Sequence, residues 1–211
     1  MLLVAFQHGN TFNFVFPFAK GNLVDFWERK PGRSKQDVLW LIRQLLGITK
    51  ALSMIHNPGW LKGPKGDLFG RHGDIKPENI LIFDHDIEGE IMVLSDMGLT
   101  AVHSEISRSG VNPAKIDTTL TYRPPETDYK SKGVSRAFDI WTLGCLFMEA
   151  MVWHLGGYDM LKRFYTARKS IDIRDIATSK YYDIKNVRTQ FLAVTPRYTA
   201  SLKKPVVEVS V

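Results

Sequence analysis

Cysteine is almost absent from this chain of 211 residues, because Cys145 is the only one. A single thiol excludes a disulfide within the chain and a zinc site made of several cysteines. Long apolar runs are lacking as well, since the longest, from Ile140 to Trp153, contains Glu149 and is too short to span a bilayer. The apolar residues 1–6 are too few for the core of a signal peptide and lack a basic leader. These absences predict an intracellular protein, in the cytoplasm or the nucleus, with no transmembrane segment and no membrane partner.

Neither sign of charge dominates the chain. Lysine and arginine number 28 against 22 aspartates and glutamates, and the net charge of +6 is spread along the sequence. One basic cluster contains Lys20, Arg29, Lys30, Arg33 and Lys35, and we interpret it as a solvated surface. No nucleic-acid-binding motif accompanies it, so the sequence predicts no nucleic-acid partner. Apolar residues at 44% and charged residues at 24% are typical of a globular protein, which excludes a disordered chain, a collagen and a coiled coil.

The first twenty residues predict a β-hairpin. Strands are expected over 2–6 and 11–18, separated by a turn signal at 7–10. Every second residue from Phe12 to Phe18 is phenylalanine, and this period of two is typical of a strand with one apolar face.

Two long helices are expected further along the chain. The first begins after an N-cap at Ser34 and ends at the stop signal of residues 57–59. Its apolar residues recur at helical spacing and are Val38, Leu41, Ile42, Leu45, Ile48, Leu52 and Ile55. The second runs from residue 135 or 136 to Trp153 and is apolar nearly all round, which is typical of a helix at the centre of a domain.

The segments around these helices are expected to be short or irregular. Residues 59–71 are rich in glycine, proline and lysine and predict an exposed loop. Two apolar runs, 80–83 and 91–94, predict a small hairpin, and the chain end from Lys203 predicts a tail.

The strongest chemical signal is the run from His72 to Asn79, HGDIKPEN. Phosphoryl transfer requires a carboxylate to orient the attacking hydroxyl, a cation near the moving phosphate, and oxygen ligands for magnesium. Asp74, Lys76 and Asn79 supply one of each within six residues, and Asp96 follows the predicted hairpin as a second hard ligand. Taken singly, each residue is better explained as a turn former or a surface charge. Their combination favours a phosphoryl-transfer site.

These motifs resemble those of eukaryotic protein kinases. HGDIKPEN and Ser95-Asp96-Met97-Gly98 are similar to the catalytic loop and the metal-binding motif of the family. Residues 118–126, TTLTYRPPE, resemble its peptide-positioning loop, and residues 139–144, DIWTLG, resemble the start of its buried central helix. Residues 16–23 are similar to the hinge between the two kinase lobes. Lysine two residues after Asp74 is the serine/threonine-type pattern.

The resemblance implies a role for each matching residue. Asp74 would orient the substrate hydroxyl, Lys76 would contact the transferred phosphate, and Thr119 would bond to both and order the substrate loop. Asn79 and Asp96 would bind Mg²⁺. Other expected roles concern ATP and the support of the loop: backbone groups near Phe18 and Ala19 would bind the adenine edge, Leu81 would lie under the ring, and Asp139 would accept backbone hydrogen bonds from the catalytic loop. His72, Met97 and Cys145 are expected to pack and not to react.

The fold expected from the resemblance is α+β: a protein-kinase-like, mainly helical C-lobe preceded by two strands of a truncated N-lobe. Residues 1–20 would be the N-lobe remnant, 21–204 the C-lobe and 205–211 a tail. A glycine-rich loop and a strand lysine paired with a helix glutamate are missing from the sequence before the hinge. The chain alone is therefore expected to be weakly active or inactive. Without their partner strands, the hairpin phenylalanines are expected to be partly exposed.

Two further departures concern charge. Gly73 stands where most kinases have an arginine that pairs with a phosphate on the activation segment, so the usual phosphorylation switch is expected to be weak or absent. Residues 196–200 resemble a shortened form of the segment whose arginine pairs with the glutamate of the Pro-Pro-Glu motif. Arg197 and Glu126 are the candidates for this pair, and Glu126 is expected to be buried.

Three functions remain open from the sequence. The first is an ATP-dependent protein kinase acting on serine or threonine of a protein substrate. The second is a pseudokinase-like scaffold that binds a protein partner. The third is a small-molecule phosphotransferase, because the triplet 72–74, HGD, is similar to the loop of aminoglycoside and choline phosphotransferases. Those families lack the segment YRPPE, which places the third function last.

Overall fold

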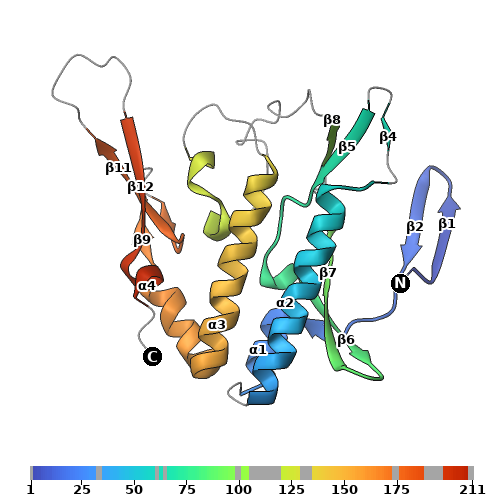
Figure 1. Cartoon of the computed structure of the whole chain (residues 1–211), viewed down its shortest axis with the longest axis horizontal. Coiled ribbons are helices and arrows are strands. Elements are labelled where there is room, and N and C mark those ends of the chain that lie inside the picture. Colours follow the sequence, from blue (N-terminus) through green and yellow to red (C-terminus); the bar gives the residue numbers. More distant parts are fainter. Residues whose placement is uncertain are drawn as a thin grey trace.

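A computed structural model describes residues 2–31, 35–59, 62–63, 66–97, 101–104, 120–128, 135–172, 176–187 and 197–208. Two long helices, α2 (Lys35–His56) and α3 (Arg136–Ala167), form its centre, and small antiparallel sheets lie around them (Figure 1). The fold is α+β, as the sequence predicted.

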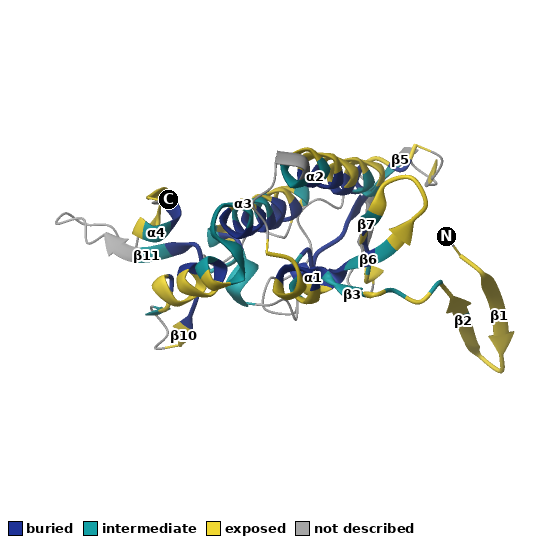
Figure 2. Cartoon of the chain, turned by 90° about the horizontal axis from the view of Figure 1, so that it is seen from below, coloured by how far each residue is buried: buried dark blue, intermediate teal, exposed yellow. Residues whose placement is uncertain are grey.

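The N-terminal strands β1 (Val4–His8) and β2 (Thr11–Val15) pair with each other as the predicted hairpin. Gly9 takes a positive φ of 58° in the turn, a conformation that glycine adopts without strain. The second strand ends at Val15 and not at Phe18, because Pro17 has no amide hydrogen to donate. Figures 1 and 2 show this hairpin set apart from the rest of the chain. The side chain of Phe14 is 60% exposed, which confirms the expected exposure of the phenylalanines.

A short helix that the sequence analysis did not predict, α1 (Leu23–Arg29), follows the hinge segment. A capping box begins it: the Asn22 side chain accepts from the amide of Asp25, and the Asp25 side chain accepts from the amide of Asn22. This helix buries Leu23 and Trp27 in the core.

Helix α2 follows the predicted span, although its expected N-cap Ser34 lies outside the described residues. Its buried stripe consists of Leu41, Leu45, Ile48 and Leu52. Ile42 was predicted to face the core and is 56% exposed. In the described part of the chain α2 alone is long and apolar enough to cross a membrane by length and composition, criteria that the core helix of a soluble protein also meets. It packs against α3 and two sheets.

Two three-stranded sheets lie beside α2. In the first, β3 (Gly21–Asn22) pairs with β6 (Ile80–His85), and β6 pairs with β7 (Gly89–Leu94) as the predicted hairpin. In the second, β5 (Gly66–Arg71) lies between β4 (Lys62–Gly63) and β8 (Ala101–Ser104). The prediction of a loop over 59–71 was therefore wrong for β5. A strand of this polar composition forms because a distant segment, β8, supplies hydrogen-bond partners.

Helix α3 begins where predicted, since the Ser135 side chain accepts a hydrogen bond from the Ala137 amide. It continues past the expected end at Trp153, with a break at Gly157, whose φ is 71°. The predicted central position is confirmed for the first half, where Leu146 and Ala150 are fully buried.

The C-terminal part consists of short strands and one helical turn. β9 (Ser170–Ile171) pairs with β10 (Ala177–Thr178), and β11 (Tyr182–Val187) pairs with β12 (Arg197–Leu202). Helix α4 (Lys204–Val207) follows. The expected tail is not detached over this stretch, because Val206 is 8% exposed and belongs to the core.

Candidate active site

Three of the predicted residues meet in the loop between β5 and β6. Lys76 Nζ lies 2.8 Å from Asp74 Oδ2. Asn79 Nδ2 donates to the same oxygen at 3.0 Å and to the Asp74 carbonyl oxygen at 2.8 Å. Asp74 Oδ1 bonds to no residue that the structure describes. The turn of 3-10 helix η1 (Pro77–Asn79) brings Asn79 back toward Asp74. The loop therefore holds one carboxylate in a fixed orientation beside an ammonium group.

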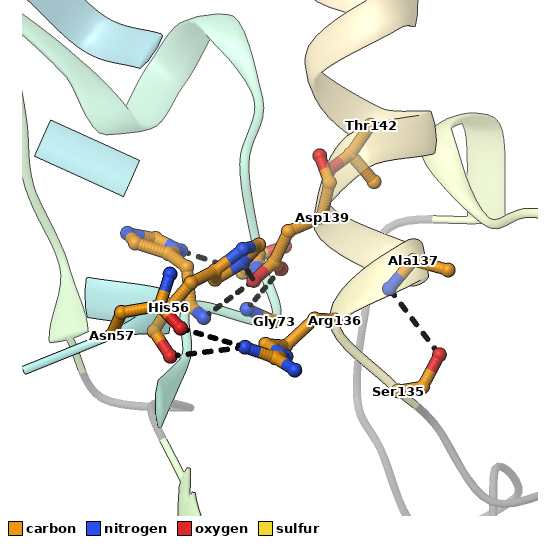
Figure 3. A network of polar contacts seen from close by, with 10 residues as sticks. His56, Asn57, Gly73, Ser135, Arg136, Ala137, Asp139 and Thr142 are labelled. Carbon is orange, nitrogen blue, oxygen red and sulfur yellow. Dashed lines mark hydrogen bonds and ion pairs between the residues drawn. The ribbon is translucent and has the colours of Figure 1, made fainter. Parts of the chain in front are cut away.

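The backbone of this loop is held by Asp139, in the first turn of α3 (Figure 3). The amides of His72 and Gly73 donate to its two carboxylate oxygens, each at 2.8 Å. Asp139 is fully buried, and His56 Nε2 lies 2.8 Å from its Oδ2. These contacts confirm the expected role of Asp139. They also reveal His56, which sequence reasoning missed although it stands four residues after Leu52 on the buried stripe of α2.

His72 connects the loop to the open end of the β6–β7 hairpin, where β6 begins and β7 ends. It is fully buried, and its Nε2 lies 3.0 Å from the Ser95 carbonyl oxygen. Ser95 in turn donates from its amide and its hydroxyl to the Asn79 carbonyl, each at 2.9 Å. Asp96 follows, exposed and with a φ of 63°, a conformation that non-glycine residues rarely adopt. The two predicted metal ligands thus belong to segments that are bonded to each other next to the loop.

The predicted nucleotide end is much less enclosed. Phe18 is fully exposed, and Ala19 and Leu81 are half-buried. Lys20 fixes the segment to the sheet, since its amide donates to the Ile82 carbonyl at 2.8 Å. The structure thus brings the hinge segment to β6, the strand that carries Leu81.

Several expectations lie outside the described residues or need correction. Thr119 and Gly98 are not among the described residues, and nothing is described of the Arg197 side chain. Glu126 was expected to be buried and is exposed, because it lies on the surface of 3-10 helix η6 (Pro125–Thr127). Met97 was expected to pack and is 47% exposed. Cys145 is buried as expected, and burial raises the pKa of its thiol, which makes it a poor nucleophile.

A buried polar cluster around Glu149 was also missed. Tyr122, in 3-10 helix η5 (Leu120–Tyr122), donates to Glu149 Oε2 at 2.8 Å. Tyr181 donates to Oε1 at 2.5 Å, and Arg168 Nη2 donates to the same oxygen at 3.1 Å. Because Tyr122 belongs to the TTLTYRPPE segment, the cluster ties the expected peptide-positioning loop to α3 and to the C-terminal strands. A glutamate in an apolar helix was the only sequence signal.

The charges of this cluster depend on one another. Burial raises the pKa of the Glu149 carboxyl, and Arg168 and the tyrosine hydroxyls oppose that shift. Burial also raises the pKa values of Tyr122 and Tyr181 well above the ordinary value for tyrosine, so both hydroxyls remain donors. The guanidinium of Arg168 is fully buried and stacks over the Tyr181 ring, with 3.9 Å between Cζ and the ring centroid.

We expect Arg168→Met to lower the free energy of unfolding by about 3 kcal/mol, because it leaves the Glu149 carboxylate buried without its cation. The double variant Arg168→Met/Glu149→Gln is expected to recover part of that loss. Denaturant unfolding of the two single variants and the double variant measures the coupling. Strictly additive losses would contradict the pairing.

Three residues of the basic cluster are exposed to solvent, as expected, and also form ion pairs. The side chains of Lys20, Arg29 and Lys30 lie 3.1, 3.4 and 3.2 Å from the Glu90 carboxylate, and Lys20 lies 2.9 Å from Asp84. Burial favours the neutral form of Glu90, but Lys20 and Lys30 outweigh it and lower the pKa of the carboxyl. The cluster therefore joins the hinge, α1 and β7. Arg33 lies outside the described residues, and nothing is described of the Lys35 side chain.

Known proteins resemble this chain over most of its length. The sequence profile of the family described as Protein kinase domain matches residues 1–196. Cyclin-dependent kinase 14 of Xenopus tropicalis is 33% identical over 140 residues, which are 66% of this chain and 28% of that protein. The proteins of the same name from Homo sapiens and Mus musculus are 32% identical over 139 residues, 66% of this chain and 26% of each relative. The match therefore spans less than a third of the length of these relatives.

Proposed function

Because the chain belongs to the protein kinase family, we propose that its reaction is transfer of the γ-phosphate of ATP to a serine or threonine hydroxyl of a protein. The observation that carries the proposal is the convergence of Lys76 and Asn79 on one oxygen of Asp74, in a loop whose backbone is bonded to Asp139. Phosphoryl transfer depends mainly on positioning and on charge stabilisation, and this loop supplies both.

In this proposal each loop residue has one task. Lys76 and Asn79 occupy Asp74 Oδ2, which leaves Oδ1 to accept the hydroxyl proton and orient the attacking oxygen. The Lys76 ammonium also stabilises negative charge on the transferred phosphate. Thr119, by resemblance, orders the substrate loop, and the hydrogen bond from Tyr122 to Glu149 ties that loop to α3.

The oxygen donors present fit magnesium. The side-chain nitrogen of Asn79 donates to Asp74, so the side-chain oxygen of Asn79 points elsewhere and is a candidate ligand. Asp96 supplies a carboxylate. Among the described residues no three histidine, cysteine or acidic side chains could hold a metal together. A cation at Asn79 and Asp96 would complete its shell with water and nucleotide phosphates, as Mg²⁺ usually does. Bound Mg-ATP would supply the phosphoryl group and offset its charge.

We also propose that this chain alone transfers phosphate slowly. Phe18, Ala19 and Leu81 offer an adenine site that is open to solvent, and the β1–β2 hairpin above the hinge does not cover it. The proposed division is a remnant of the N-lobe over 1–20 and a C-lobe from residue 21 onward that includes α4, because Val206 packs in the core.

A scaffold that binds a protein partner is the second candidate, because the exposed adenine site favours weak nucleotide binding. The relatives are named cyclin-dependent kinases, and a protein of the cyclin kind is one candidate partner. If the chain is a protein kinase, which is the first candidate, its partners also include protein substrates. The third candidate, a small-molecule phosphotransferase, is disfavoured by the family match across residues 1–196.

Thermal melting with Mg-ATP tests nucleotide binding. We expect Mg-ATP at about ten times its Kd to stabilise the chain by about 1.4 kcal/mol, which raises the Tm by roughly 3 °C. EDTA and the substitution Asp96→Asn are each expected to abolish the rise. Asp159→Asn is a matched control, since its side chain is 80% exposed on α3, and it should respond as the unchanged chain does. A cooperative melt with no shift would contradict Mg-ATP binding and favour the scaffold.

A further inference from the structure

The outer face of α2 is apolar although it is exposed. Leu39, Ile42, Leu46 and Met54 are between 50% and 60% exposed. They recur at helical spacing over four turns and form a stripe on the side opposite the buried residues of the helix. Figure 2 shows α2 at the rim of the molecule, with exposed residues along its outer side. An apolar stripe of this length is typical of a surface that another molecule covers.

Two cations lie within the stripe. Arg43 and Lys50 are exposed and are seven residues apart, which places them on the same face about 10 Å from each other along the helix axis. Neither forms an ion pair with any residue that the structure describes. No acidic residue of α2 shares their face, because Asp37, the helix's one acidic residue, precedes the stripe. The stripe therefore carries positive charge that nothing described in this chain neutralises.

A glycine lies at the edge of the same stripe, near the middle of the helix. Gly47 is exposed in the middle of α2, and a Cβ atom there would meet no other atom within 4 Å. A glycine inside a helix destabilises it by about 1 kcal/mol relative to alanine. No packing within the described chain requires Gly47, whereas a partner lying across the stripe could approach the backbone closely there.

We infer that the stripe on α2, defined by Leu39, Ile42, Leu46 and Met54 with Arg43 and Lys50 between them, docks an acidic amphipathic helix of a partner protein. Apolar residues of that helix cover the stripe, and carboxylates one heptad apart pair with the two cations. The inference concerns a surface that the proposed catalytic loop does not use, and it stands whether or not the chain transfers phosphate.

The charges argue against two other occupants. If a second copy docked antiparallel about Leu46 and Gly47, Leu39 would meet Met54 but Arg43 would meet Lys50, so cation would face cation at both ends. On a helix that lies in a membrane surface, the cations flank the apolar face and reach toward the head groups. Here Arg43 and Lys50 project between Leu39 and Met54, near the middle of the face.

A charge-swap binding experiment tests the inference. The probe is a fluorescent synthetic amphipathic peptide of about 20 residues, as long as α2, with leucines on one face and two glutamates one heptad apart. A second peptide has lysines in place of the two glutamates. We expect the glutamate peptide to bind the full chain and the variant Arg43→Glu/Lys50→Glu to bind it about tenfold more weakly, as loss of two exposed ion pairs of about 0.7 kcal/mol each implies. The lysine peptide should prefer the variant.

The matched control is Arg163→Glu/Lys169→Glu, which changes the net charge equally at two exposed cations near the end of α3. It should bind the glutamate peptide within about twofold of the unchanged chain. A second variant, Leu46→Gln, should bind the glutamate peptide more weakly than the unchanged chain does. It should still prefer the glutamate peptide to the lysine peptide. Circular dichroism establishes that each variant retains the helices.

Three outcomes would overturn the inference. The first is equal affinity of the chain for the two peptides. The second is preferential binding to vesicles containing phosphatidylserine, lost in the charge-reversed variant, with no peptide binding, which would assign the face to a membrane surface. The third is dimerisation in sedimentation experiments that Leu46→Gln abolishes, which would assign it to a second copy.

Discussion

Asp139→Ala is expected to lower the free energy of unfolding by about 5 kcal/mol, which corresponds to a fall in Tm of roughly 10–20 °C for a chain of this size. The carboxylate is fully buried, and it accepts hydrogen bonds from the amides of His72 and Gly73 and lies beside His56. Hydrogen bonds to a charged group contribute about 1.5–3 kcal/mol each, and their loss leaves two backbone amides buried without an acceptor.

Thermal unfolding and hydrogen exchange check this prediction together. In the unchanged chain the amides of His72 and Gly73 should exchange slowly, and in Asp139→Asn, which keeps one acceptor oxygen, one of them should exchange much faster. The control is Asp159→Ala, whose side chain is exposed and pairs with Lys162 in the following turn, so its Tm should change by less than about 2 °C. A small effect of Asp139→Ala would mean that the loop does not depend on α3.

Local patterns were sufficient to predict the two central helices. The spacing of Leu41, Leu45, Ile48 and Leu52 predicted the buried face of α2, because helical periodicity is a property of the sequence itself. It could not show that Ile42 would face outward, since that depends on what covers the neighbouring side. The predicted end at Trp153 lies close to the break in α3 at Gly157, whose φ of 71° is not helical, but the sequence did not show that the helix resumes after this break.

Segments whose structure depends on distant partners could not be predicted from their own residues. Strand β5 forms because β8 lies beside it, and the two are about thirty residues apart in the chain. Helix α1 has only seven residues, so its capping box at Asn22 and Asp25 was a weak signal.

The candidate site divides in the same way. Asp74, Lys76 and Asn79 are close in sequence, so their motif alone brought them together, and the structure adds the shared oxygen of Asp74. The residues that support this loop and its neighbour come from three separate elements: His56 from α2, Asp139 from α3 and Tyr122 from η5. His56 and Glu149 are polar residues in apolar helices, and only the tertiary structure shows that each meets a partner.

The largest effect on activity is expected for Asp74→Asn. The substitution keeps the size of the side chain and can preserve the contact with Lys76, but it removes the negative charge that would accept the hydroxyl proton. A general base contributes about 10²–10⁴ to the rate, so we expect transfer to fall at least 100-fold. The Tm should change by only a few degrees, because the amide has the size of the carboxylate and its oxygen can still accept the hydrogen bond from Asn79.

Phosphate transfer from labelled ATP to a serine- and threonine-containing peptide library tests the account most directly. The purified chain should transfer phosphate in the presence of Mg²⁺ at a rate well below the roughly 1–100 s⁻¹ of typical kinases. Asp74→Asn should reduce that transfer at least 100-fold, whereas Asp159→Asn should leave it unchanged. Transfer that is the same in Asp74→Asn as in the unchanged chain would contradict a phosphoryl-transfer site at Asp74.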